Sequence, residues 1–312
     1  MMKAATLTLN PALDRTMYFD KPFRAGELNR CCDTVTTLGS KGINVSRFLK
    51  IFDIDAIAYG FSGGDTGRTM ESMLRDEGVE FSFVQTEAPT RMNIKMIDSE
   101  GICTEANEKG GPITEAALKS LIEMMENSAE KGKYFFLGGS IPHPVDKSVY
   151  NSITQVLKSR GAKVILDCDG EALERGIEAG PSLIKPNLYE LSLLVHRQIN
   201  DPCEAIKECK RLYVEKSVEI LCTMSEKGAI FAGREGVYSV TSPRVELRGF
   251  TGAGDSFLSA FTYMRHTTGD IEYSLRFASS AAAAKVELPG STLPDKADMD
   301  KYIDAVTARR YE

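Results

Sequence analysis

Helical patterns and short apolar strands alternate along the chain from residue 115 to residue 223. Apolar residues recur at helical spacing in residues 116–125 and 147–159, and a strand pattern follows each, at 134–137 and 163–167. This alternation is typical of βαβ units, whose parallel strands form one sheet with helices on both faces. The series continues with strands at 183–184 and 218–223 and helices at 189–195 and 203–214. We therefore expect an α/β fold with a doubly wound, mainly parallel sheet.

The first third of the chain departs from this rhythm. It begins regularly, with a strand at 4–9, a helix at 42–52, a strand at 54–61 and a helix at 66–76. Other segments have the polar and apolar alternation or the turn signals of half-exposed strands: 16–19, 31–37, 81–85, 91–97 and 102–106. We expect these segments to form a small β-sheet lid, near residues 12–37 and 81–106, within a single domain that spans residues 1–312.

Composition narrows the classes of function. A formal net charge of −6 argues against a dedicated nucleic-acid binder, which needs a basic surface. Seven cysteines, an odd number without CxxC spacing, favour free thiols in a reducing cytoplasm, and we expect the adjacent Cys31 and Cys32 to pack in the core. No apolar run reaches the roughly 20 residues of a membrane helix, and no signal-peptide core is present. We expect a cytoplasmic protein that uses neither nucleic acid nor membrane as a partner.

A glycine-rich turn near the C-terminus leads into an apolar helix that begins close to Asp255. Gly252 and Gly254, with Ala253 between them, let the backbone curl around a ligand, and the free N–H groups of a helix start favour an anion such as phosphate. A carboxylate beside a phosphate makes sense if Asp255 takes the proton from an attacking nucleophile. The alternative is that Asp255 only complements the helix dipole.

Two other turns follow predicted strands, where ligands gather in open α/β sheets. Asp14 could accept hydrogen bonds from the hydroxyls of a polyol, or it could be a turn-forming residue. The segment GSKGIN at 39–44 offers a ligand flexible backbone, a cation and an amide, through Gly39, Lys41, Gly42 and Asn44. The alternative is that it is only a flexible helix start. No GxxxxGK[ST] loop occurs, which excludes the common P-loop route to ATP.

Arg91, Asn93 and Lys95 share one face of a predicted strand, because side chains alternate along a strand. Two cations around an amide could clamp an anion, although the polar outer face of a ribbon would give the same pattern. Asn187 and Glu190 have the spacing of a helix capping box, and could equally hold water around Mg²⁺.

In order along the chain, these motifs resemble the PfkB (ribokinase-like) family of carbohydrate kinases. The two family signatures correspond to GSKGIN at 39–44 and TGAGD at 251–255, with supporting matches at 10–14, 139–142 and 185–190. Ser40 and Ser225 stand where the family commonly has glycine. Lys41 and Arg91 match the family's phosphate-binding positions, as in its sugar-phosphate kinases. The string TRMNIK at 90–95, with KGIN at 41–44, most resembles the 1-phosphofructokinase group, and the tagatose-6-phosphate kinase group is close.

The resemblance implies a doubly wound three-layer fold with a β-sheet lid, ATP as co-substrate and Mg²⁺ as cofactor. It makes Asp255 the catalytic base, residues 252–254 the anion hole, and Asn187 and Glu190 the metal-side pair, acting through water. The substrate residues are Asp14, Gly39, Lys41, Gly42, Asn44, Arg91, Asn93, Lys95 and Ser140. The nucleotide residues are Lys185, Asn187, Thr223, Ser225, Gly228, Thr251, Gly252 and Gly254.

The implied reaction is phosphorylation of a ketohexose monophosphate hydroxyl, with fructose 1-phosphate converted to fructose 1,6-bisphosphate as the first expectation. Tagatose 6-phosphate or fructose 6-phosphate is the alternative substrate. A kinase for an unphosphorylated sugar or nucleoside, and a sugar-phosphate sensor without turnover, are the other hypotheses. Because lid strands often pair across subunits in the family, a homodimer through the lid is expected.

Overall fold

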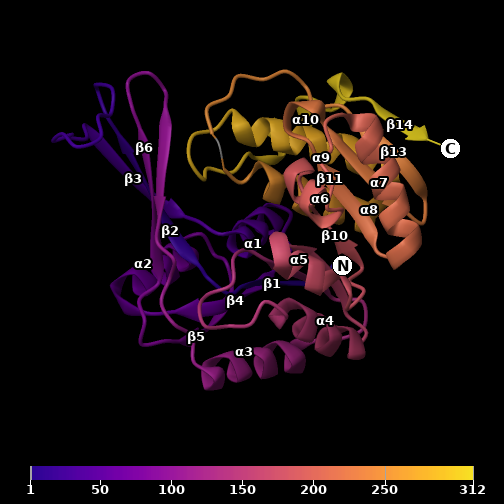
Figure 1. Cartoon of the computed structure of the whole chain (residues 1–312), viewed down its shortest axis with the longest axis horizontal. Coiled ribbons are helices and arrows are strands. Elements are labelled where there is room, and N and C mark those ends of the chain that lie inside the picture. Colours follow the sequence, from indigo (N-terminus) through magenta and orange to yellow (C-terminus); the bar gives the residue numbers. More distant parts are fainter. Residues whose placement is uncertain (1, 250, 312) are drawn as a thin grey trace.

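A large ten-stranded sheet forms the centre of the protein in a computed structural model that describes residues 2–249 and 251–311 (Figure 1). The strand order is β14-β13-β12-β11-β10-β9-β8-β1-β4-β5, and the strands from β5 to β11 are parallel. Their bounds are β1 (Ala4–Thr8), β4 (Ala56–Ser62), β5 (Phe81–Gln85), β8 (Tyr134–Gly138), β9 (Lys163–Asp167), β10 (Leu183–Ile184), β11 (Glu219–Thr223), β12 (Ala229–Gly233), β13 (Gly236–Val240) and β14 (Ala308–Tyr311). The expected mainly parallel sheet is confirmed, and β12, β13 and β14 extend it in antiparallel fashion.

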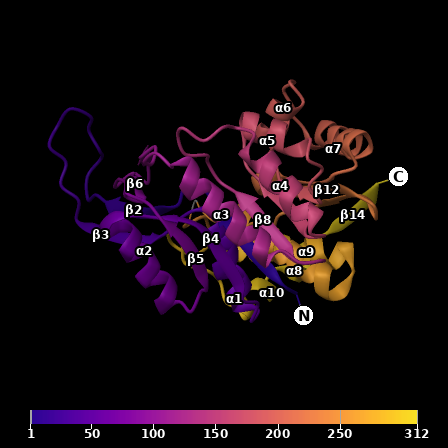
Figure 2. The ribbon, with the colours of Figure 1, turned by 90° about the horizontal axis from the view of Figure 1, so that it is seen from below.

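Helices cover both faces of this sheet, giving three layers (Figure 2). One apolar core lies under α3 (Glu115–Ser128), α4 (Val149–Ser159), α5 (Gly170–Ile177), α6 (Leu188–Leu194) and α7 (Pro202–Lys216). The other lies under α1 (Lys41–Ile51), α8 (Ala253–Thr268), α9 (Ile271–Val286) and α10 (Lys296–Asp300), while α2 (Gly64–Asp76) covers the β5 end. The near-continuous apolar runs of the strands follow from burial on both faces.

A separate four-stranded sheet stands beside the main body, in the order β3-β2-β6-β7 (Figure 1). Its strands are β2 (Ala12–Tyr18), β3 (Asp33–Leu38), β6 (Arg91–Ile97) and β7 (Cys103–Asn107). β2 and β6 run parallel, with Asp14 opposite Asn93 and Thr16 opposite Lys95. The predicted small sheet is therefore present.

Two sequence expectations about this region are wrong. Residues 81–85 were expected in the small sheet, but β5 pairs with β4 at the edge of the large sheet, where Phe81 and Phe83 pack toward α2. Cys31 and Cys32 were expected in the core, but both are exposed in the connection before β3. Alternation alone does not say to which sheet a short strand belongs.

No helix in the described ranges combines the length and apolar character needed to cross a bilayer.

Candidate active site

The order of strands places the site. β1 lies between β4 and β8: β4 and β5 are added on one side of it, and β8 and β9 on the other. A crevice is expected at the carboxyl ends of the strands where the order reverses in this way. Lys41 opens α1 at this point, and a Cβ on Gly138, the last residue of β8, would lie 3.5 Å from the Cβ of Lys41. Gly42 packs close to β1, since its Cβ would lie 2.6 Å from the hydroxyl of Thr8.

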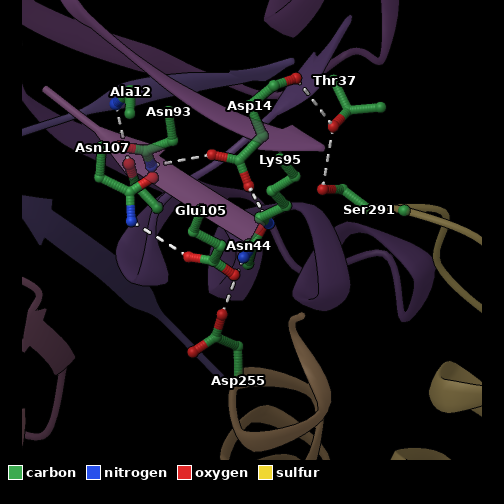
Figure 3. Close-up of polar contacts among 12 residues, drawn as sticks. Ala12, Asp14, Thr37, Asn44, Asn93, Lys95, Glu105, Asn107, Asp255 and Ser291 are labelled. Carbon is green, nitrogen blue, oxygen red and sulfur yellow. Dashed lines mark hydrogen bonds and ion pairs between the residues drawn. The ribbon is translucent and has the colours of Figure 1, made fainter. Parts of the chain in front are cut away.

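The turn before α8 carries the predicted catalytic carboxylate. Gly252 caps the helix with φ at +83°, a left-handed conformation that favours glycine, and residues 251–254 are half-buried. Asp255 lies in the first helical turn, is buried, and accepts a 2.8 Å hydrogen bond from Nδ2 of Asn44 (Figure 3). Burial, with the charge of Asp167, raises the pKa of Asp255 to about 6 although Asn44 opposes the shift.

Next to Asp255 is a carboxylate–lysine cluster, formed by Lys41, Asp167, Lys185 and Glu190. Nζ of Lys41 lies 2.6 Å from Oδ1 of Asp167, and Nζ of Lys185 lies 3.2 Å from Oδ2. Burial would raise the pKa of Asp167, but Lys185 and Lys41 outweigh it and lower that pKa. Burial likewise opposes the charge on Lys41, yet Asp167 and Glu190 raise its pKa. Each partner thus favours the charged form of the other in the Lys41–Asp167 pair.

Asn187 and Glu190 form a complete capping box at the start of α6. Oδ1 of Asn187 accepts from the Glu190 N–H at 2.8 Å, and Oε2 of Glu190 accepts from the Asn187 N–H at 2.7 Å. The structural alternative is therefore realised. The other carboxylate oxygen of Glu190 faces Lys41 at 4.0 Å, and burial raises the pKa of Glu190.

A cavity of about 840 Å³ opens beside this capping box. Asn187, Thr223 and Ser225 line it, together with residues of α6 and the segment 196–199. Ser225 has φ at +52°, a left-handed value that favours glycine. Gly228 is buried behind the turn, where a Cβ would lie 1.8 Å from the carbonyl of Val240, so its role there is in packing.

Asp14, Asn93 and Lys95 face the site from β2 and β6 (Figure 3). Arg91, which donates to Asn93, completes what we call the small-sheet network. Asp14 accepts from Nδ2 of Asn93 and from Nζ of Lys95, each at 2.9 Å. The predicted sharing of one strand face by Asn93 and Lys95 is confirmed. Close packing explains why residue 39 is glycine, since a Cβ at this position would lie 2.5 Å from Oδ1 of Asp14.

Arg91 differs from the other cations of the site. Its guanidinium donates to the carbonyls of Asn10 and Glu108 and to Oδ1 of Asn93, and it makes no ion pair within residues 2–249 and 251–311. The neighbouring Asn10 also donates to Oγ of Ser140, at 3.1 Å, which brings the turn after β8 to the small sheet. Lys41 and Lys95, by contrast, already have carboxylate partners.

Comparison with known proteins agrees with this arrangement. The model of the pfkB family carbohydrate kinases matches residues 7–298. The chain belongs to this family. It is 35% identical over 256 residues to the 1-phosphofructokinase of Bacillus subtilis (strain 168), covering 82% of this chain and 83% of that protein. It is 34% identical over 281 residues to the 1-phosphofructokinase of Borreliella burgdorferi, covering 89% and 90%.

The fold is similar to that of a solved kinase. The tetrameric inhibited form of phosphofructokinase-2 from Escherichia coli superposes with a TM-score of 0.90 and 28% sequence identity, over 98% of this chain and 99% of that chain. The family resemblance predicted from the two signatures is confirmed. Ser40, which replaces a common glycine of the family, has φ at +84°, so the backbone explains why glycine is frequent there.

Two charged residues at the site were not predicted from the sequence. Asp167 is the last residue of β9. Because ligands gather at the carboxyl ends of parallel strands, its position at the end of a predicted strand could have indicated it. Lys285 is a single lysine at the end of the alanine-rich stretch of α9, and its contact with the Gly252 turn follows only from the packing of α9 on α8.

Proposed function

We propose that this protein transfers the γ-phosphoryl group of ATP to a hydroxyl of fructose 1-phosphate, giving fructose 1,6-bisphosphate. The observation that carries the proposal is Asp255, a buried carboxylate in the first turn of α8, beside a glycine turn and within reach of Asn44. The 1-phosphofructokinases of Bacillus subtilis and Borreliella burgdorferi, which are similar over most of the chain, support the choice of substrate.

Asp255 acts in this scheme as the general base. With a pKa of about 6, its carboxyl group is mostly ionised at neutral pH, yet basic enough to take the proton of the attacking hydroxyl. The N–H groups of residues 252–254 and the positive end of the α8 dipole stabilise the charge on the transferring phosphoryl group. Lys185 supports them, because its Nζ would lie 3.5 Å from a Cβ on Gly254.

The nucleotide is proposed to occupy the cavity beside α6, with Lys185 and the Gly252–Gly254 turn near its phosphates and Asn187, Thr223, Ser225 and Thr251 around it. The oxygen set there suits Mg²⁺, which prefers one or two carboxylates together with phosphates and waters. The capping box uses Oε2 of Glu190 and leaves its Oε1 for such a contact, whereas Oδ2 of Asp167 already lies 3.2 Å from Nζ of Lys185. Mg²⁺ held through water by Asn187 and Glu190 would neutralise phosphate charge.

The sugar phosphate is proposed to lie between the small sheet and α1. Arg91 is the main phosphate ligand, since no carboxylate pairs with it in the described structure. Asp14, Asn44 and Asn93 hold sugar hydroxyls, while Gly39 and Gly42 allow the close approach and Ser140 completes the rim. Lys41 and Lys95 add positive charge, and for a direct phosphate contact each must exchange its present carboxylate partner.

A comparison of substrates tests the proposal. ADP release by the purified protein with Mg-ATP is measured against fructose 1-phosphate, fructose 6-phosphate, tagatose 6-phosphate and fructose. We expect the highest kcat/KM with fructose 1-phosphate. A higher kcat/KM with fructose 6-phosphate or tagatose 6-phosphate would make that sugar phosphate the substrate instead. Binding of fructose 1-phosphate without ADP release would indicate a sensor.

The small sheet is also proposed to join two subunits in a cytoplasmic homodimer. Its edge regions carry exposed apolar side chains, with Val35 on β3 at 42% exposure and Ile102 beside β7 at 56%. The tetrameric form reported for the Escherichia coli relative is consistent with self-association in the family. Light scattering should give twice the monomer mass, and Val35→Asp should shift the protein to monomer.

A further inference from the structure

Lys285 is a fully buried lysine that has no role in the reaction as described above. It lies near the end of α9 with 0% exposure, and its Nζ donates a 2.9 Å hydrogen bond to the carbonyl of Gly290. A buried ammonium is costly unless its charge has a use or a partner. Among residues 2–249 and 251–311, no carboxylate forms an ion pair with it.

The side chain of Lys285 runs beneath the turn that leads into α8. A Cβ on Gly252 would lie 3.3 Å from Cε of Lys285, and a Cβ on Gly249 would lie 3.4 Å from its Nζ. The end of α9 also fixes the chain before the turn, because the carbonyl of Val286 accepts from the N–H groups of Arg248 and Gly249, at 2.7 and 2.9 Å. Lys285 therefore contacts the turn at its entry and at its helix cap.

Lysines flank the glycine turn on two sides. Lys185 approaches Gly254 and is paired with Asp167, so most of its charge is compensated locally. Within the described part of the chain, the ammonium of Lys285 donates to a carbonyl and pairs with no carboxylate, so its charge acts on whatever occupies the turn. In a water-poor interior such a fixed charge acts strongly on an anion that approaches the helix start.

We propose that Lys285 is a positioning residue for phosphoryl transfer, whose buried ammonium holds the Gly252 turn in shape and adds fixed positive charge behind it. The inference rests on the proposed kinase function. It assigns to Lys285 an effect on the transition state through the turn, without direct contact with the sugar.

The charge state of Lys285 gives the proposal a measurable signature. Burial, together with the positive charges of Arg47 on α1 and Lys95 on β6, lowers the pKa of Lys285 to about 8, while Asp255 on α8 opposes the shift. The lysine is thus charged at pH 7 in the free protein and loses its charge as pH rises through about 8. A phosphate bound at the turn would favour the charged form.

The experiment compares Lys285→Met with the wild-type protein in the ADP-release assay. We expect kcat to fall by about tenfold to a hundredfold in Lys285→Met, with the KM for the sugar phosphate little changed. This loss is smaller than the roughly 10²–10³-fold loss seen when a donor in direct contact with the reacting group is removed, because Lys285 acts through the turn. In the wild type, kcat/KM for ATP should decline above pH 8. That decline should be absent in Lys285→Met.

Lys133→Met is the matched control. Lys133 is also buried and donates to a backbone carbonyl, that of Ser128 at 3.0 Å, but it precedes the amino end of β8, whereas the site lies at the carboxyl ends of the parallel strands. The Lys133→Met protein should be less stable than wild type, while its kcat and its decline in kcat/KM above pH 8 should equal those of the wild type. Lys285→Arg keeps its positive charge at high pH, so it should retain turnover and show no decline in kcat/KM above pH 8. If Lys285→Met does not fold, Lys285→Arg tests the proposal on its own.

Three results would overturn the inference: normal kcat in folded Lys285→Met, an alkaline decline that persists in Lys285→Met or Lys285→Arg, or the same kinetic loss in Lys133→Met. A wild-type protein that releases no ADP with any sugar phosphate would instead contradict the proposed function.

Discussion

The small-sheet network and the carboxylate–lysine cluster both combine acids and lysines, yet they are built differently. The network takes Asp14, Asn93 and Lys95 from two paired strands and satisfies their charges by direct contact. The cluster draws its members from α1, β9, α6 and the chain after β10, pairs Asp167 with two lysines, and leaves Oε1 of Glu190 4.0 Å from the nearer of them, Lys41. In the proposed function, the network would hold the sugar phosphate and the cluster would lie beside the phosphates of the nucleotide.

The largest expected effect comes from Asp255, which lies beside the carboxylate–lysine cluster. Asp255→Asn removes the proposed base but keeps a side chain of the same shape, so kcat should fall about 10²–10⁴-fold with little change in KM. Steady-state kinetics with fructose 1-phosphate measures this. Near-normal turnover would remove the catalytic role from Asp255 and, with it, the proposed difference between the two regions.

A substitution in the small-sheet network should lower the stability of the folded protein. Lys95→Met leaves the buried carboxylate of Asp14 without its ion pair, which should lower the free energy of unfolding by about 3 kcal/mol. Urea denaturation measures the loss, with Lys119→Met as control because the Lys119–Glu123 pair is exposed. Equal losses in the two variants would show that the Asp14–Lys95 pair contributes no more than a surface pair.

Arg91 should separate binding from chemistry. Arg91→Ala should raise the KM for the sugar phosphate about tenfold to a hundredfold, the value of one charged hydrogen bond, while kcat and the KM for ATP stay near wild type. Arg15→Ala is the control, since Arg15 is exposed on the same sheet and donates to the Thr36 hydroxyl. An unchanged KM in Arg91→Ala would show that another cation binds the phosphate.

The smallest effect is on pH dependence. Because Asp255 must be ionised to accept a proton, kcat/KM should fall as pH drops through about 6. Its pKa in the folded state is above the ordinary value of 3.8, so its stabilising contribution is complete below pH 3.8 and is lost as pH rises through about 6.

Thermal unfolding tests the stability part of this prediction. Asp255→Asn should melt at a higher temperature than wild type at pH 7.5, and the difference should vanish at pH 3.5. A variant that is less stable than wild type at pH 7.5 would indicate that the ionised carboxylate stabilises the fold.

Sequence predicts the network better than the cluster for a physical reason. Strand alternation alone places Asn93 and Lys95 on one face, and a local turn places Asp255 at a helix start. The ion pair of Lys41 with Asp167, and the approach of Lys285 to Gly252, depend on segments more than 30 residues apart in sequence. The same limit explains β5, whose pairing with β4 is settled by packing against α2.

The most direct test of the central claim follows the transferred phosphorus. Phosphorus-31 NMR of the purified protein with Mg-ATP and fructose 1-phosphate should show loss of the γ-phosphate signal, one equivalent of ADP, and a second sugar phosphate ester at C6. No such signal should form with Asp255→Asn on the same timescale. Release of free phosphate without a new ester, or an ester formed equally fast by Asp255→Asn, would contradict the account.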